Sequence, residues 1–292
     1  MSTHNTLGDK PQHLGLTTAD TEQPTEFIPL VRDAKEMKML YRRSSTNTEI
    51  NRAVSLGDIV ITDPEELRLE YDGCATFVTT LCAEVILLAR QLPRLHRIIN
   101  SGRVTIDGTW TMWVLRCRLG PTATLRKLSG ADLIYDVTMK AVSKGRRVML
   151  LGGDQKANAD AVRNLGAMSG KPHLVTGYSP QFLPLPFPEF VQEEIRRQIA
   201  KERPDILILG LGVPKQEYWA EDNRSFLRTV GVSYVMFFGG AIDFAAGKYR
   251  RAPRWVQQIG LESLIRLIQN PRRWRRELSK LSFIWLLITN RL

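Results

Sequence analysis

The sequence has few of the residues that bind metal ions or crosslink a chain. Its 292 residues include only three cysteines and four histidines, and these are scattered without the pairing of a zinc site. A sparse, odd number of cysteines is typical of proteins from a reducing compartment. We therefore expect no metal site.

Long apolar segments are also absent. Residues 1–26 are polar and lack the apolar core of a secretory signal. The longest uninterrupted apolar run near the other end, Phe283–Ile288, has six residues, whereas spanning a bilayer takes about 20. The sequence thus predicts no secretory signal in residues 1–26 and no membrane-spanning helix around residues 283–288.

A dinucleotide-binding fingerprint is incomplete. The spacing from Gly210 to Lys215 is G-x-G-x-x-K, so the third glycine is missing. The next apolar run, 232–238, ends in Gly239 and Gly240 without the acidic residue that would bind a ribose. An NAD-dependent oxidoreductase is therefore weakly supported.

Positive charge is abundant and concentrated at one end. The net charge is +11, and the last 45 residues hold eleven Lys and Arg against two Glu, which leaves +9 there. A basic end on a nearly neutral remainder indicates an anionic partner, and membrane lipid, a phosphorylated substrate and nucleic acid are the candidates.

The middle of the chain alternates between two kinds of segment. With 43% hydrophobic residues the chain can bury a large core. Strands are expected at 58–62, 75–80, 103–106, 147–151, 173–176, 205–209 and 232–238, and helices at 83–91, 95–99, 109–118, 131–144, 157–165 and 189–201. This alternation predicts a Rossmann-like α/β fold, a mostly parallel sheet with helices on both faces, over residues 54–245. Residues 1–53 are expected to form a disordered or loosely ordered extension, and residues 246–292 a helical appendage.

The stretch 204–217, PDILILGLGVPKQE, organises the candidate chemistry. A buried strand ends in Gly210 and Gly212, and Pro214 suits the first turn of the following helix. Ligands of parallel sheets bind beyond the carboxyl ends of the strands. Gln216 would offer an amide donor and acceptor there, or it could simply occupy an exposed helical turn.

Two further candidates follow other strands. Asp107, in Ile-Asp-Gly, would face the cleft and could accept a proton from a substrate hydroxyl, although Asp-Gly is also a common turn. Thr80 could hydrogen-bond a sugar or phosphate at a strand-to-helix corner, or it could cap the helix. The helix at 109–118 is expected to open with a threonine cap.

Candidates for nucleotide binding lie later in the chain. Asp243 comes just after a buried strand and two glycines and should reach the carboxyl edge of the sheet, or it is only a turn carboxylate. Tyr178 could stack on a ring or only plug its loop. Arg251 and Arg254, beside Arg250, carry guanidinium groups that suit bidentate phosphate binding. A solvated basic face is the alternative, but acids are almost absent nearby, which favours a functional role.

The C-terminal segment interleaves cations with bulky apolar residues. Two amphipathic helices are expected, at 255–268 and 274–287. Arginines 272, 273, 275 and 276 and Lys280 accompany Trp274, Phe283 and Trp285, a pattern typical of a helix lying in an anionic bilayer interface. Docking of the helix on the protein's own core, and burial in a homo-oligomer, are the alternatives. A nucleic-acid-binding module is also conceivable, but no reading motif is present.

These segments, taken together from about residue 58 to 276, resemble the WecG/TagA/CpsF glycosyltransferase family. The resemblance rests on VTTLCAEVILLAR, IDG, GADL (which holds Asp132), LLGG, GY, GLGVPKQE and FFGGAIDFAAGKYRRAPRWVQQIGLESLIRLIQNPRR, in that order. One departure is Thr80-Leu81-Cys82, where the family usually has T-x-N.

The resemblance implies a cofactor-free, metal-independent, inverting transfer of a hexose of the glucose or N-acetylmannosamine type. The donor would be a UDP-sugar and the acceptor a polyprenyl-diphosphate-linked saccharide at the cytoplasmic face of a bacterial plasma membrane. By position, Asp107 would be the general base, and Thr80 and Gln216 would line the active site. Tyr178, Asp243 and Asp132 would bind substrate, and Arg251 and Arg254 would neutralise the leaving diphosphate. No convincing D-x-D motif is present to hold a metal, and arginines can replace one.

Overall fold

A computed structural model describes most of the middle of the chain. The described residues are 54–56, 58–120, 123–181, 184, 186–249, 253, 256, 265, 267, 268 and 283. They all belong to Asn51–Leu292, the second of the chain's two units. The expected extension at 1–53 and nearly all of the appendage at 246–292 lie outside the described residues.

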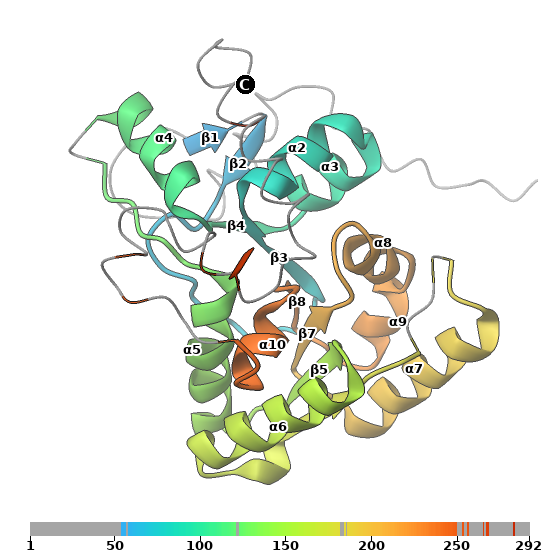
Figure 1. Cartoon of the computed structure of the whole chain (residues 1–292). Coiled ribbons are helices and arrows are strands. Elements are labelled where there is room, and N and C mark those ends of the chain that lie inside the picture. Colours follow the sequence, from blue (N-terminus) through green and yellow to red (C-terminus); the bar gives the residue numbers. More distant parts are fainter. Residues whose placement is uncertain are drawn as a thin grey trace, which may run out of the picture. The chain divides into compact units, whose positions relative to one another are not determined.

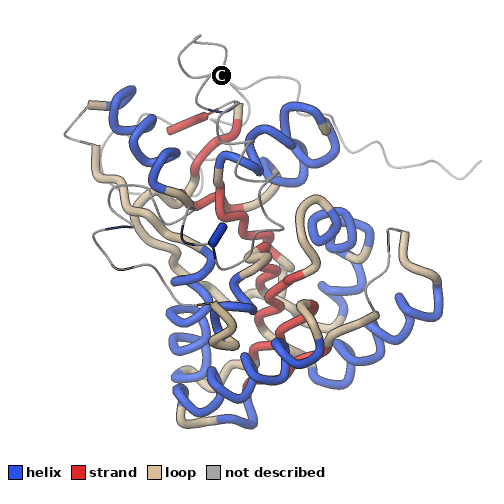
Figure 2. Tube along the Cα trace, in the orientation of Figure 1, coloured by secondary structure: helices blue, strands red, loops and turns tan. Residues whose placement is uncertain are grey.

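A six-stranded sheet forms the centre of the fold (Figures 1 and 2). Every neighbouring pair in it is parallel, and the strand order is β4-β3-β8-β7-β5-β6. The strands are β3 (Thr76–Leu81), β4 (Arg103–Ile106), β5 (Val148–Gly152), β6 (Val175–Tyr178), β7 (Ile206–Gly210) and β8 (Tyr234–Phe237). The prediction of a parallel α/β sheet is confirmed.

Alternate strand residues build two separate cores, because successive side chains of a strand point to opposite faces. Val148 and Leu150 of β5 join one core, and Met149 and Leu151 join the other. The first core is covered by α5 (Gly130–Ser143), α6 (Gln155–Ser169) and α10 (Ala241–Ala245), and the second by α7 (Glu189–Glu202), α8 (Lys215–Asp222) and α9 (Arg224–Thr229). Both sets of helices are seen around the sheet in Figure 1.

A third core lies beside β3 and β4 and contains a structure that the periodicity did not predict. The expected strand at 58–62 is β2 (Ile59–Ile61), which pairs antiparallel with β1 (Val54–Leu56) in a hairpin and does not join the six-stranded sheet. The hairpin packs with α2 (Ala83–Gln91), α3 (Pro93–Asn100) and α4 (Thr109–Leu119). A three-residue apolar strand carries too little sequence pattern to show which strand it pairs with.

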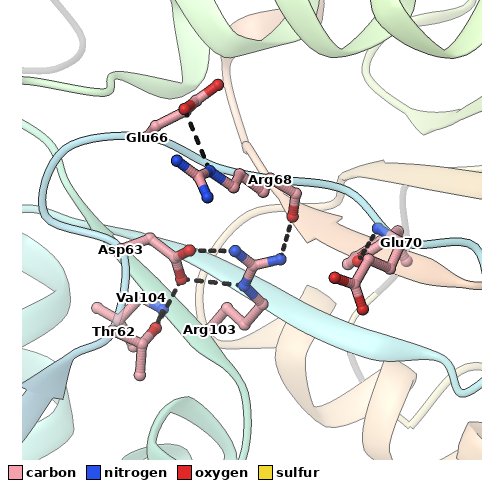
Figure 3. Close-up of polar contacts among 8 residues, drawn as sticks. Thr62, Asp63, Glu66, Arg68, Glu70, Arg103 and Val104 are labelled. Carbon is pink, nitrogen blue, oxygen red and sulfur yellow. Dashed lines mark hydrogen bonds and ion pairs between the residues drawn. The ribbon is translucent and has the colours of Figure 1, made fainter. Parts of the chain in front are cut away.

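A polar cluster fastens the segment after this hairpin to β4 (Figure 3). The Arg103 guanidinium donates through Nε to Asp63 Oδ2 at 3.0 Å, through a second nitrogen to Asp63 Oδ1, and through its third to the carbonyl oxygen of Arg68. Thr62 Oγ1 donates to Asp63 Oδ2 at 2.7 Å and accepts from the Val104 N–H at 2.7 Å. Arg103 begins β4, so this cluster lies at the amino end of the strand and has a structural role.

Three expectations about local structure need correction. Gly108, not a threonine, caps α4, and Thr109 is its first helical residue. The strand expected at 173–176 starts later, because Pro172–Leu174 forms a 3₁₀ turn before β6. Asp243, for which a turn was the alternative, lies in the short helix α10. Each difference concerns only a few residues, where tertiary contacts outweigh periodicity.

One described residue of the C-terminal segment lies inside the protein. Phe283 is helical, fully buried (0% exposed), and part of the third core. Its ring is therefore not available to enter a bilayer, which differs from the interfacial position expected from the sequence. At this residue the structure favours the alternative of docking on the protein's own core. Among the helices of the described residues, none has the length and apolar character needed to cross a membrane.

Candidate active site

The carboxyl ends of all six strands meet at one edge of the sheet, because every pair is parallel. Thr80, Asp107, Tyr178, Gln216 and Asp243 lie at the ends of strands or just beyond them, so they belong to this edge. A shared site requires that all of its residues lie at the same edge of the sheet. These five residues meet that requirement, since none of them follows the opposite end of a strand.

Glycines let the backbones approach closely at the centre of this edge. Gly152 and Gly210 are register partners at the ends of β5 and β7. Gly152 has φ +105°, and a Cβ atom there would lie 2.8 Å from the Gly210 carbonyl carbon. A Cβ atom on Gly210 would lie 2.5 Å from Ile242 Cδ1 of α10. Gly152 thus allows the ends of β5 and β7 to approach each other, and Gly210 allows α10, which carries Asp243, to pack directly over the strand ends.

Asp107 and Thr80 occupy adjacent strands. The Asp107 N–H donates to the Leu81 carbonyl at 2.9 Å, which fixes the backbone of Asp107 against the end of β3. Thr80 is buried and lies opposite Thr105 of β4. The structure therefore brings these two predicted residues to one corner, with Asp107 half-buried.

Cys82 follows Thr80 at this corner. Burial, and secondarily the negative charge of Asp107, raises the pKa of the Cys82 thiol from 9.0 to about 11. The group is consequently a neutral thiol at physiological pH. Where the family usually has an asparagine, this chain presents a weak hydrogen-bonding group close to Asp107.

Gln216 has a partner that the sequence did not single out as a site residue. Its Nε2 donates to Glu217 Oε1 at 2.9 Å, in the first turn of α8. Both side chains are buried, and Glu217 is only 1% exposed. Gln216 Oε1 and Glu217 Oε2 each lack a hydrogen-bond partner among the described residues. The pair thus holds two unused oxygens beneath the edge of the sheet.

Glu217 is a perturbed carboxyl group. Burial is the main cause that raises its pKa from 4.5 to about 7, and the charge of Glu84 in α2 adds to it, while the Gln216 hydrogen bond opposes it. Glu84 lies in the first turn of the helix that follows β3. Its effect on the pKa of Glu217 shows that the Gln216–Glu217 pair lies within electrostatic range of the corner that holds Thr80 and Asp107. Strong pKa shifts of this kind cluster at functional sites.

Asp243 belongs to a second polar group. Lys248 Nζ donates to Asp154 Oδ2 at 2.6 Å and lies 3.5 Å from Asp243 Oδ1. Asp154 also caps α6 by accepting from the Ala157 N–H at 2.8 Å. Hydrogen bonding to Lys248 and then to Ala157 lowers the pKa of Asp154, so it carries a negative charge at neutral pH. The group is half-buried to exposed and open to a polar ligand.

Asp132 lies near the first corner. The Leu128 N–H donates to the Ile106 carbonyl at 2.7 Å, which places the start of α5 alongside the end of β4. Ser129 Oγ donates to Asp132 Oδ2 at 2.6 Å. The carboxylate is exposed and oriented by this hydrogen bond.

Tyr178 is separated from Asp107 by the whole width of the sheet. It ends β6, and β4 forms the opposite margin. Five spacings of about 4.8 Å put these two strands roughly 24 Å apart. Burial raises the pKa of the Tyr178 hydroxyl, which therefore stays protonated. Of the remaining candidates, Arg251 and Arg254 lie outside the described residues.

The structure adds three candidate site residues to those that the sequence singled out. Asp154 directly follows a strand and two glycines, a signal equal to that of Asp243, but it was not singled out. Glu217 belongs to the same motif as Gln216, but only its burial distinguishes it, and Lys248 is identified by a tertiary contact alone. Within the described residues, no cluster of three or more His, Cys, Asp and Glu side chains could hold a metal ion.

A parallel sheet with polar groups along its carboxyl edge is typical of enzymes that bind nucleotide-type ligands. The protein-family model described as "Glycosyl transferase WecG/TagA/CpsF family" matches residues 59–292. Because this match covers most of the chain, the chain belongs to that family and is a glycosyltransferase, as the resemblance implied.

Two curated relatives carry the same name, N-acetylglucosaminyldiphosphoundecaprenol N-acetyl-beta-D-mannosaminyltransferase. The relative from Bacillus spizizenii strain W23 is 29% identical over 206 residues, which cover 70% of this chain and 75% of the relative. The relative from Bacillus subtilis strain 168 is 30% identical over 170 residues, which cover 57% of this chain and 61% of the relative.

Proposed function

We propose that this glycosyltransferase moves an N-acetylmannosamine-type sugar from a UDP donor to a polyprenyl-diphosphate-linked N-acetylglucosamine, at the inner face of a bacterial plasma membrane. Family membership supports the reaction class, and the name shared by the two relatives supports the sugar and the acceptor. A glucose-type donor is the closest alternative. The placement of Asp107 at the carboxyl edge is the observation that carries the mechanism.

In this proposal, the reaction is a single displacement. Asp107 accepts the proton of the acceptor hydroxyl as that oxygen bonds to the anomeric carbon, and the bond to the UDP oxygen breaks. Attack from the face opposite the leaving group inverts the anomeric centre. Thr80 and Gln216 would position the sugar beside Asp107, and Arg251 and Arg254 would stabilise the charge on the departing diphosphate.

The separation along the sheet suits an extended donor. Tyr178 and the Asp154–Lys248–Asp243 group would bind the nucleotide half, and the corner of Asp107, Thr80 and Asp132 would bind the reacting sugars. Lys248 bridges two carboxylates, so a nucleotide phosphate or ribose would compete with them for its ammonium group.

Replacement of the proposed base tests this mechanism. With UDP-N-acetylmannosamine and a lipid-diphosphate N-acetylglucosamine acceptor, Asp107→Asn is expected to lower UDP release at least about 100-fold, because the amide cannot accept the proton. Asp136→Asn, which removes an exposed carboxylate on α5, should retain wild-type turnover.

Two results would count against the proposal. Near-normal turnover by folded Asp107→Asn would remove this residue from the role of base. If the wild-type protein released UDP from none of a panel of UDP-hexoses, with any lipid-diphosphate saccharide as acceptor, the proposed reaction itself would be wrong.

A further inference from the structure

Helix α4 presents an unusual outer surface directly after Asp107 and Gly108. Its inner side is buried in the third core through Thr111, Met112 and Leu115. On its outer side Trp113 is 45% exposed, and the half-buried Trp110 packs edge-on against it with ring centroids 5.5 Å apart. Of the three tryptophans that the structure describes, only Trp219 is buried, and the exposure of Trp113 is not explained by packing.

The sequence around these rings is positively charged. Arg116, Arg118, Arg126 and Lys127 lie between residues 108 and 129, and this stretch contains no carboxylate. Arg116 and Arg118 are exposed and form no ion pair with any other residue in the described ranges. The α4 face, defined here as Trp110, Trp113, Arg116 and Arg118, therefore combines aromatic surface with unneutralised cations.

Another exposed aromatic residue provides a contrast. Phe190 on α7 is 68% exposed, but acidic residues Glu189, Glu193 and Glu194 surround it in sequence. Arg196 and Arg197 pair with Glu189 and Glu194, so the charge beside this ring is largely neutralised, unlike that of the α4 arginines, which pair with no other described residue. Tryptophan rings, by comparison, favour the headgroup level of a bilayer, and arginines beside them are attracted to its anionic phosphates.

We propose that the α4 face contacts the interface of an anionic lipid bilayer and holds Asp107 at the level of a lipid-borne acceptor. The purpose given to this contact rests on the proposed function, whereas the contact itself rests on the exposed tryptophan and the local charge.

Vesicle flotation with the full chain tests the contact. Binding is compared on phosphatidylcholine vesicles and on vesicles that also contain phosphatidylglycerol, without any substrate. Trp113→Ser and the double variant Arg116→Gln/Arg118→Gln are each expected to lower the partition coefficient on the anionic vesicles at least about five-fold.

The chain offers matched controls for both changes. Phe190→Ser removes an exposed aromatic ring, and Arg163→Gln/Arg197→Gln removes two charges from exposed arginines on α6 and α7. Both should bind within about two-fold of wild type. Unchanged thermal melting of the α4 variants would establish that they are folded.

A second measurement concerns the purpose of the contact. The α4 variants should keep wild-type turnover on a short-chain, water-soluble acceptor and lose turnover on an acceptor embedded in vesicles. Because flotation uses no substrate, its result stands even if the proposed function fails. Wild-type flotation by both α4 variants would overturn the inference. A change in molar mass on sedimentation, without a change in flotation, would also overturn it and assign the face to a second copy of the chain.

Discussion

A carboxyl group buried beside a site residue is the least expected feature at the scale of single residues. Glu217 is held out of water at the start of α8, where Gln216 donates to one of its oxygens. The hydrogen bond is made to an acceptor oxygen, so the protonated acid satisfies it as well as the carboxylate does. Glu217 thereby orients the Gln216 amide, and at low pH it does so without a full negative charge beneath the carboxyl edge of the sheet.

The elevated pKa of Glu217 predicts a pH-dependent stability. The folded protein keeps a proton that the unfolded chain releases between about pH 4.5 and 7. The stability due to this proton is complete below about pH 4.5 and is lost as the pH rises through 7, up to roughly 3 kcal/mol in all. Glu217→Gln cannot titrate. In urea unfolding, the free energy of unfolding of the variant relative to wild type should therefore increase between pH 5 and pH 8.

A surface carboxylate provides the control for this prediction. Glu66→Gln changes an exposed side chain and should shift unfolding by a similar small amount at both pH values. If Glu217→Gln behaved in the same way as Glu66→Gln, the buried carboxyl would be ionised in the folded protein throughout, and its raised pKa would be refuted.

At the scale of elements, the ends of β5 and β7 approach each other closely at the centre of the sheet's carboxyl edge. Their last residues are glycines in register, and α10 packs over them. This close packing depends on the absence of side chains at two positions. The same packing fixes α10, which carries Asp243, relative to the end of β5, which is followed by Asp154.

Substitution of one of these glycines should destabilise the protein more than its conformation alone would. Gly152→Ala combines φ +105° with a backbone contact at 2.8 Å, so we expect a loss of about 3 kcal/mol or more in the free energy of unfolding. Gly170→Ala shares a positive φ but meets nothing within 4 Å, and it should lose about 1 kcal/mol. Equal losses in chemical denaturation would show that the close approach contributes nothing.

At the largest scale, the described part of the chain is built from a two-faced sheet with a third core beside β3 and β4. This third core holds α2, α4, the β1–β2 hairpin and Phe283, and Asp107 lies at its border with the sheet. Phe283 thus contributes to the core that supports the loop beginning at Asp107.

Phe283 should consequently matter for stability. Phe283→Ala removes a fully buried ring and is expected to lower the free energy of unfolding by about 3–5 kcal/mol. Ile268→Ala, at an exposed position of the same C-terminal segment, should change it by less than about 0.5 kcal/mol. An effect of Phe283→Ala as small as that of Ile268→Ala, measured by urea unfolding, would place the ring outside the core.

Much of the fold could be predicted from the sequence because its signals are local. The predicted helix at 83–91 and strand at 103–106 agree with α2 and β4 residue for residue, since apolar runs and turn residues specify them directly. The hairpin, α10 and the later start of β6 were missed because pairing partners, proline turns and packing over glycines act across the chain.

The candidate site divides in the same way. By itself the sequence determined the parallel α/β class, the family, and the strand-end positions of Asp107, Thr80, Gln216 and Asp243, because these depend on residue order and on motifs. Only the tertiary structure decided that Glu217 is buried with a raised pKa, that Lys248 joins Asp154 to Asp243, that Tyr178 lies at the far margin, and that Phe283 faces inward. Burial and the order of strands in the sheet depend on contacts between distant residues, and no local pattern encodes them.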